Sequence, residues 1–166
     1  MPRSIEHSAT YDCPPAAVHA ALTDEQYWRA RVSAVGGPGA TLDSVAVANG
    51  GIEVTLTQIV AAEHLPAIVG KITSGDLTIS RTESWGPLEA DAATGAVTAK
   101  IAGTPATVRG VNSLTGTDSR TTLRSAGDAT VPIPLIGGKI EQAVADNVTR
   151  LLIAEQQFTE HWLTRK

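Results

Sequence analysis

The sequence has few of the residues from which several kinds of catalytic site are built. Cysteine occurs once, as Cys13, which excludes an internal disulfide and a cysteine-based metal cluster. Its Asp-Cys-Pro-Pro context predicts a turn and a weak nucleophile. A Gly-x-Ser-x-Gly motif of a serine hydrolase is missing. The histidines lack the close spacing that preorganises a metal site; they are His7, His19, His64 and His161. We therefore assign no catalytic residue and expect no metal and no cofactor.

Long apolar runs and clusters of positive charge are also lacking. No apolar stretch approaches the roughly 20 residues that span a bilayer, and the N-terminal residues lack the apolar run of a signal peptide. The net charge is −4 and the basic residues are scattered singly, whereas a general nucleic-acid binder clusters them. We expect a cytoplasmic protein with no nucleic-acid partner and no integral-membrane segment. The sequence leaves a homodimer open.

The residues that are present fit one folded domain spanning 1–166. Hydrophobic residues make up 42% of the chain and charged ones 18%, which is typical of a globular and not of a disordered protein. The few aromatic residues fall mainly in two pairs, Tyr27 with Trp28 and Phe158 with Trp162. A place in the core is the first interpretation of both pairs. The second pair shares one helix face, so its alternative is the end wall of a cavity.

Periodicity predicts one strand, two short helices, six further strands and a long helix. Residues 3–12 alternate with period two, and residues 16–22 fit a short helix. Thr23 with Gln26 has capping-box spacing for a second helix, which the glycines from Gly36 end. The remaining strands are expected at 42–48, 52–60, 77–85, 96–102, 106–115 and 119–126, while Pro66–Thr73 is ambiguous. Apolar spacings of three, four and seven after residue 138 indicate an amphipathic helix of roughly 25 residues.

These elements predict how the chain is layered. Successive hairpins imply one continuous antiparallel sheet, and a long amphipathic helix must bury its apolar stripe against another element. We therefore predict an α+β fold in which a curved seven-stranded antiparallel sheet wraps around the C-terminal helix. The two short helices lie between the first and second strands, and a space separates sheet and long helix.

Several motifs carry a resemblance to a known superfamily. The opening strand, the segment from Pro15 to Trp28 and the C-terminal helix resemble the START-like, or helix-grip, superfamily, which includes birch-pollen-allergen-like proteins and polyketide cyclases. A more specific resemblance, to an uncharacterised actinobacterial branch, rests on the motifs at 65–66, 83–85, 103–110 and 133–141. The resemblance covers essentially the whole chain and implies the fold. It implies no catalytic residues, because this scaffold carries binders, lipid carriers, cyclases and co-chaperones.

Arg81 and Glu83 are charged residues on an apolar strand face. In the strand at 77–85 the odd positions hold the apolar and aromatic residues, so Arg81 and Glu83 are expected to face the helix with them. A buried charge is costly unless it is paired. A structural salt bridge is the first interpretation, followed by ligand recognition and then by acid/base catalysis.

Other strands are expected to send single polar groups inward among apolar neighbours. This pattern suits a cavity with hydrophobic walls and few orienting polar groups. For His7 a satisfied buried histidine is the first interpretation, followed by a pocket donor and then by a general base. We predict the ligand-binding residues to be His7, Tyr11, Gln58, Arg81, Glu83, Trp85, Asn112, Leu151 and Phe158.

The resemblance and the expected cavity together predict binding or transport of a hydrophobic small molecule, lipid or polyketide-like. Two alternatives stay open. One is a cyclase- or dehydratase-like enzyme, in which His7, Tyr11, Arg81 and Glu83 orient or protonate carbonyls. The other is a co-chaperone-like module that binds a protein partner in an exposed apolar groove. Leu65–Thr73 and the loop after Gly36 are expected to act as gates.

The segment Gly137-Gly138-Lys139 is similar to the end of a phosphate-binding loop. A Gly-x4-Gly-Lys-Ser/Thr motif needs an earlier glycine and a hydroxyl after the lysine, but Ile133 and Ile140 stand at these positions. We therefore expect the glycine pair to be a hinge before the long helix, with Glu141 in the first helical turn, where negative charge is favoured.

Overall fold

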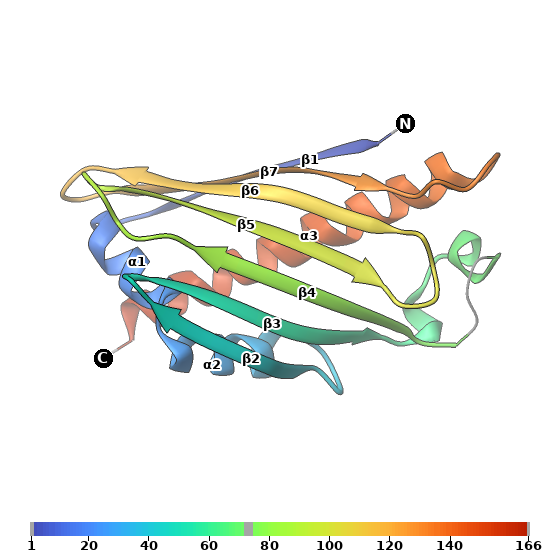
Figure 1. Ribbon diagram of the computed structural model, residues 1–166, viewed down its shortest axis with the longest axis horizontal. Coiled ribbons are helices and arrows are strands. Elements are labelled where there is room, and N and C mark those ends of the chain that lie inside the picture. The colour runs from blue at the N-terminus through green and yellow to red at the C-terminus, as the bar shows by residue number, and fades with distance from the viewer. Residues whose placement is uncertain (1, 72–74, 166) are drawn as a thin grey trace.

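A seven-stranded antiparallel sheet forms one layer of the molecule, and a long helix lies behind it (Figure 1). In this computed structural model residues 2–71 and 75–165 are described. The strands are β1 (Arg3–Tyr11), β2 (Thr41–Ala48), β3 (Gly51–Val60), β4 (Leu77–Trp85), β5 (Ala92–Ile101), β6 (Thr107–Gly116) and β7 (Thr121–Thr130). The helices are α1 (Pro15–Leu22), α2 (Glu25–Val35) and α3 (Gly137–Thr164), with two 3₁₀ helices, η1 (Ala62–His64) and η2 (Ala67–Lys71), between β3 and β4.

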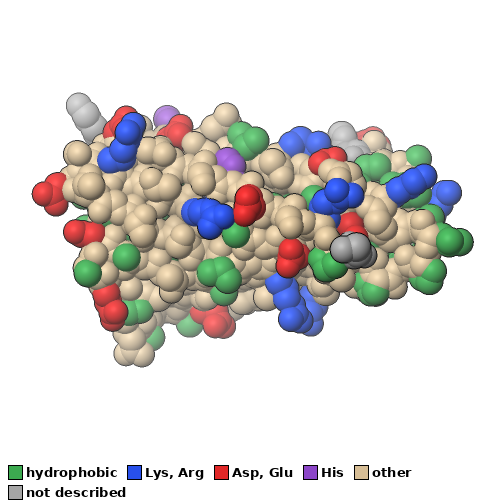
Figure 2. Space-filling model, turned by 90° about the horizontal axis from the view of Figure 1, so that it is seen from above, with side chains coloured by type: hydrophobic (Ala, Val, Ile, Leu, Met, Phe, Trp, Pro, Cys, Tyr) green, Lys and Arg blue, Asp and Glu red, His purple; other side chains and the backbone are tan. Residues whose placement is uncertain are grey.

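The sheet order is β1-β7-β6-β5-β4-β3-β2, so β1 and β2 are the two edges. Helices α1 and α2 carry the chain from one edge to the other, and α3 packs against β1, β7 and α2. This is the helix-grip architecture predicted from the sequence, with both short helices between the first two strands. In Figure 2 acidic and basic side chains are interspersed over the visible face.

Helix α2 begins one residue later than the capping-box spacing predicts. Asp24 is its N-cap, and the Asp24 carboxylate accepts a hydrogen bond from the Gln26 backbone N–H at 2.9 Å. The hydroxyl of Thr23 instead donates back to the His19 carbonyl at 2.8 Å. Asp is as good an N-cap as Ser or Thr, and here it stands directly before the helix.

Two strands are longer than predicted. β5 begins at Ala92 and β7 continues to Thr130, each about four residues beyond the range expected from side-chain pattern. The added residues are mostly alanine, glycine and aspartate, which rarely form strands on their own. Here hydrogen bonding to a strand on each side keeps these residues extended. β5 lies between β4 and β6, and β7 lies between β6 and β1.

The core lies between the sheet and the helices, on the strand faces that alternation predicts. Its largest cluster joins inward residues of β1, β3, β4 and β6 to α1 and α2, and includes the fully buried Val18, Trp28, Val54 and Leu114. Two smaller clusters tie α3 to β1, β7 and the segment before α3. Burial at this scale contributes about 25 cal/mol per Å² of apolar surface, so the sheet and helices hold together mainly through these clusters.

The turn into α3 differs from the expected glycine hinge. Leu135, with φ of 72°, makes the left-handed turn, whereas Gly137 and Gly138 are the first two helical residues. Residue 137 must be glycine because the backbone of Val131 passes close by: a Cβ at this position would lie 2.4 Å from the Val131 carbonyl oxygen. Glu141 lies beyond the first turn and is buried, and its carboxylate accepts a hydrogen bond from the Val131 N–H at 2.8 Å. The expectation that Glu141 serves the helix dipole is therefore wrong.

The two neighbouring glycines should respond oppositely to the same substitution. Gly137→Ala is expected to destabilise the fold by about 1–3 kcal/mol, because the new methyl group meets backbone that cannot retreat. Gly138→Ala, where nothing lies within 4 Å, should stabilise it by about 0.4–1 kcal/mol by restricting the unfolded chain. Urea unfolding of both variants measures the difference, and equal effects would contradict the close approach at Gly137.

Candidate functional site

A cavity of about 190 Å³ lies between the inner face of the sheet and α3. Its walls are mainly apolar and come from β1, β3 to β7, the three α-helices and η2. Gly110 and Gly127, which are register partners on β6 and β7, both line it. The flanking residues in the same row are Ile5 on β1 and Val97 on β5.

Eight of the nine predicted ligand-binding residues line this cavity: His7, Tyr11, Gln58, Arg81, Glu83, Trp85, Asn112 and Leu151. Phe158 does not. It packs between Tyr27 and Trp162, with ring centroids 5.6 and 6.1 Å away, in the aromatic cluster at one end of α3. Phe158 is thus part of the core, and ligand contact by the other eight stays a prediction.

The expected gates have different positions. Leu65, Pro66 and Val69 line the cavity, so the connection between β3 and β4 forms part of its rim. Residues 72 and 73, which belong to the same expected gate, lie outside the described residues. Within the described chain, the loop after Gly36 contributes no lining residue.

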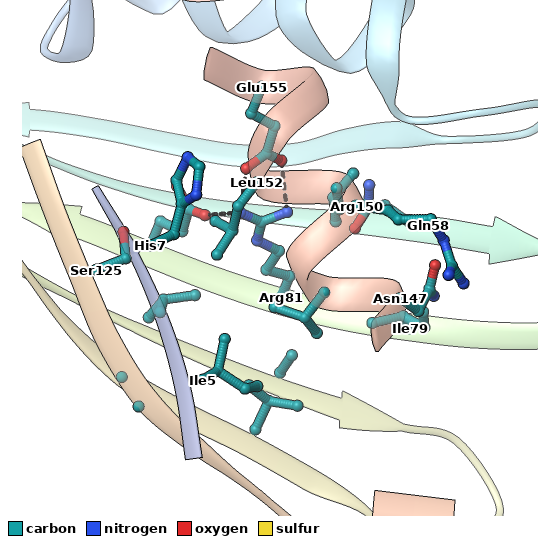
Figure 3. A pocket seen from close by; sticks show the side chains of 18 of the residues that line it. Ile5, His7, Gln58, Ile79, Arg81, Ser125, Asn147, Arg150, Leu152 and Glu155 are labelled. Carbon is teal, nitrogen blue, oxygen red and sulfur yellow. Dashed lines mark hydrogen bonds and ion pairs between the residues drawn. The ribbon is translucent and has the colours of Figure 1, made fainter. Parts of the chain in front are cut away.

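Four buried charges form one network beside the cavity. Arg81 donates to Glu155 at 2.7 and 3.0 Å and also to Glu83, its neighbour on β4. Arg31 on α2 lies 2.6 Å from Glu155 and 3.5 Å from Glu83. Figure 3 shows the dashed line between Arg81 and Glu155, which joins the sheet to α3. Two cations and two anions cancel, so the network adds no net charge to the cavity wall.

The sequence pattern identifies half of this network. It placed Arg81 and Glu83 inside but missed Arg31 and Glu155. A signal for Glu155 was present, because it stands four residues after Leu151 and four before Thr159, on the buried face of α3. Arg31 carries a weaker signal, four residues after Tyr27 on the buried side of α2.

The network changes the ionisation of its members. Burial acts to raise the pKa of Glu155, but the Arg31 and Arg81 guanidinium groups outweigh it and lower that pKa from 4.5 to about 2. Burial acts to lower the pKa of each arginine, and the carboxylates of Glu155 and Glu83 outweigh it, so both pKa values are raised. All three groups are therefore charged at neutral pH.

The low pKa of Glu155 predicts a specific loss of stability in acid. The folded-state pKa lies below the unfolded one, so the contribution is full above about pH 4.5 and is lost as the pH falls through about 2. Glu155→Gln removes the titrating group. The difference in free energy of unfolding between wild type and Glu155→Gln should therefore shrink by about 2 kcal/mol from pH 7 to pH 3. Urea titrations at the two pH values measure it.

Two buried amides in the cavity have no partner in the described part of the protein. Gln58 on β3 is 7% exposed and Asn112 on β6 is 8% exposed, and neither makes a side-chain hydrogen bond to a described residue. His7 differs, because its Nε2 atom lies 2.8 Å from the Gln156 Oε1 atom. Among described residues no fully covered side-chain nitrogen or oxygen lacks a partner, so the two amides reach the cavity space. They are free to bind polar atoms there.

The cavity meets the surface beside α3 and the β3–β4 connection, where the lining residues Pro66, Asn147 and Arg150 are exposed. Arg109 is also exposed, but it alternates with the inward Val108 and Gly110 on β6 and so belongs to the outer face of the sheet. Figure 3 places Asn147 and Arg150 together with Gln58 on one side of the pocket, and His7 with Ser125 on the other. We call Gln58, Asn147 and Arg150 the mouth.

Other kinds of site find little support in the described part of the chain. No three His, Cys, Asp or Glu side chains among those that the structure describes come together as a metal site would require. Across residues 2–71 and 75–165, none of the helices has the length and apolar character of a membrane span. Burial raises the pKa of the Cys13 thiol, as does Asp12, which disfavours the nucleophilic thiolate.

Residues 6–163 match a family described as "Protein of unknown function (DUF2505)". The chain belongs to this family. The uncharacterised protein Rv0481c of Mycobacterium tuberculosis is 35% identical to this DUF2505 member, with 99% of this chain and 98% of that protein covered. An uncharacterised protein of Mycobacterium bovis, Mb0491c, matches with the same identity and coverage. These are the actinobacterial relatives that the sequence motifs indicated.

Solved structures confirm the fold of this DUF2505 member. The Zhui aromatase/cyclase from Streptomyces sp. R1128 is similar with a TM-score of 0.66 and 14% identity, covering 99% of this chain and 95% of that one. The structure of Ara h 8.0201 is similar with a TM-score of 0.56 and 10% identity, covering 98% of both chains. At such identities the likeness shows the helix-grip fold alone.

Proposed function

We propose that this protein binds a small, mostly apolar molecule in the cavity between the sheet and α3. The observation that carries the proposal is the pair of buried amides, Gln58 and Asn112, which face an apolar space without partners among the described residues. Both amides reach the cavity space, where an amide can donate and accept hydrogen bonds, so these positions favour a bound molecule with polar atoms of its own.

The size of the cavity narrows the range of ligands. Its volume of about 190 Å³ is below that of pockets for drug-sized molecules, roughly 300–1,000 Å³. At about 30 Å³ for a water-sized group, it holds on the order of six such groups. A longer lipid or a full polyketide would need the segment Leu65–Lys71 to move outward.

Binding is favoured over the cyclase-like alternative by the state of the ionisable groups. Arg81 and Glu83 already bind each other and their partners, Glu155 and Arg31, and the low pKa of Glu155 leaves no proton to donate at neutral pH. Burial, with Tyr27 next, raises the pKa of Tyr11, so its hydroxyl gives up a proton less readily. The enclosed cavity also supports a small ligand more than a protein partner. The cytoplasmic location and the lack of a nucleic-acid partner remain predictions from sequence.

Filling the cavity tests the proposal. Ala99 on β5 lines the cavity, whereas Ala96 on the same strand is exposed on the other face. A panel of alcohols, ketones and acids of this size should raise the melting temperature of wild type and of Ala96→Leu but not of Ala99→Leu. Native mass spectrometry should show the bound mass in the same two proteins. No thermal shift across the panel, together with apo mass only, would contradict a binding function.

A further inference from the structure

The cavity has chemically different ends, and this difference identifies a class of ligand. We propose that the occupant is a small carboxylic acid with an apolar middle and a hydroxyl or carbonyl group at its far end. The inference rests on the proposed binding function. It assigns the carboxylate to the mouth and the second polar group to a row of polar side chains on β7 and β6.

The mouth carries a cationic side chain that has no anion beside it. Arg150 makes no ion pair with any described residue, although Asp146 stands one helical turn before it. Asp146 instead accepts a hydrogen bond from Gln142 at 2.7 Å. Asn147 is three residues before Arg150 and so shares its helix face, and the unpartnered Gln58 lies on the same side of the pocket (Figure 3).

These groups suit a carboxylate better than a phosphate. A guanidinium fork binds the two oxygens of a carboxylate side by side, and the Asn147 and Gln58 amides can donate to the same oxygens. A phosphate brings roughly two negative charges, whereas the mouth offers a single guanidinium. The interior cannot add to it, because Arg31 and Arg81 are each held by Glu155 and Glu83.

The far end offers neutral hydrogen bonds. Asn112 and Ser125 are register partners on β6 and β7, and His7 is the next residue in the same row on β1. Both Asn112 and Ser125 line the cavity and make no side-chain hydrogen bond to a described residue. An amide and a hydroxyl can each donate and accept. A hydroxyl or carbonyl of the ligand satisfies them, while a second charge would lack a counterion.

The two ends are separated by an apolar stretch. Gln156, which holds His7 at 2.8 Å, stands six residues after Arg150 on α3, or roughly 9 Å along the helix axis. Ile5 and Leu152 line the pocket between the two ends (Figure 3). An eight-carbon chain matches this separation.

Four eight-carbon probes separate the contributions: 8-hydroxyoctanoate, octanoate, 1,8-octanediol and octylamine, each titrated calorimetrically. We expect 8-hydroxyoctanoate to bind most tightly, with octanoate about three- to tenfold weaker and octylamine weakest. Arg150→Gln should weaken both carboxylates about tenfold and leave the diol unchanged. Ser125→Ala should reduce the difference in affinity between 8-hydroxyoctanoate and octanoate. Arg124→Gln, which removes an exposed arginine on β7 that pairs with Glu6, should change none of these values.

The possible outcomes distinguish a failure of the assigned ligand class from a failure of the binding function itself. Diol and carboxylates of equal affinity, or carboxylate affinity unchanged in Arg150→Gln, would overturn the assigned ligand class while leaving a binding function in place. If none of the probes binds and the wider apolar panel also gives no thermal shift, the binding function itself fails. Circular dichroism of each variant confirms that the fold is retained.

Discussion

Replacing Glu155 with alanine is expected to lower the free energy of unfolding by about 3–5 kcal/mol. Glu155 is 7% exposed and is the carboxylate that both Arg31 and Arg81 contact, at 2.6 and 2.7 Å. Without it, two buried guanidinium groups share only Glu83, and one positive charge stays uncompensated in a poorly solvated place. Breaking a buried pair costs far more than the net contribution of the intact pair, since the remaining charge cannot return to water.

Urea unfolding at neutral pH measures this loss, and Glu160→Ala is the matched control. Glu160 is an exposed glutamate on the same helix, so its replacement should change the free energy of unfolding by no more than about 0.5 kcal/mol. A loss below about 1 kcal/mol for Glu155→Ala would show that water reaches the network and solvates the arginines.

Trp28→Ala should cost a comparable amount, about 3–5 kcal/mol. The Trp28 side chain is completely buried, and its Nε1 atom donates to the Leu22 carbonyl at 2.8 Å, which ties α2 to the end of α1. Its ring also lies under the guanidinium of Arg31, with the Cζ atom 4.5 Å from the ring centroid. Removing the indole leaves a large cavity, an unpaired carbonyl and an arginine without its stacking partner.

Trp28→Phe separates these contributions. It keeps an aromatic ring but removes the hydrogen bond to Leu22, so the expected loss is smaller, about 1–3 kcal/mol. The double variant Trp28→Ala with Glu155→Ala should lose less than the sum of the single losses, because both changes act on Arg31. Strict additivity would mean that the indole and the carboxylate stabilise the fold independently.

The sequence predicted the sheet well because half-buried strands have a simple pattern. Alternation in β4 is strict, so its bounds and the inward direction of Arg81 and Glu83 follow from the order of residue types alone. The same pattern predicted the inward amides Gln58 and Asn112. It fails at Ala92 and after Ala126, where small or polar residues are ordered by neighbouring strands and not by their own preference.

The remaining errors concern contacts between elements distant in sequence. Glu155 is an acidic residue within the apolar stripe of α3, and only its partners on β4 and α2 explain its place. Gly137 has a helical conformation, and the reason for glycine there is the nearby Val131 carbonyl. Phe158 could have faced either the cavity or the aromatic cluster, and the packing of α2 against α3 decides between them. None of these contacts leaves a periodic signal.

The four-charge network also fixes the position of α3 relative to the sheet. Successive residues of a helix are turned by roughly 100° and rise by 1.5 Å. If α3 moved by one residue along its axis and turned by roughly 100°, either Gln156 or Ala154 would take the place of Glu155 before the arginines, and neither carries a charge. Apolar side chains on α3 tolerate small displacements against the sheet, whereas two buried guanidinium groups require a carboxylate. Glu155 therefore selects a single register for the long helix against the sheet.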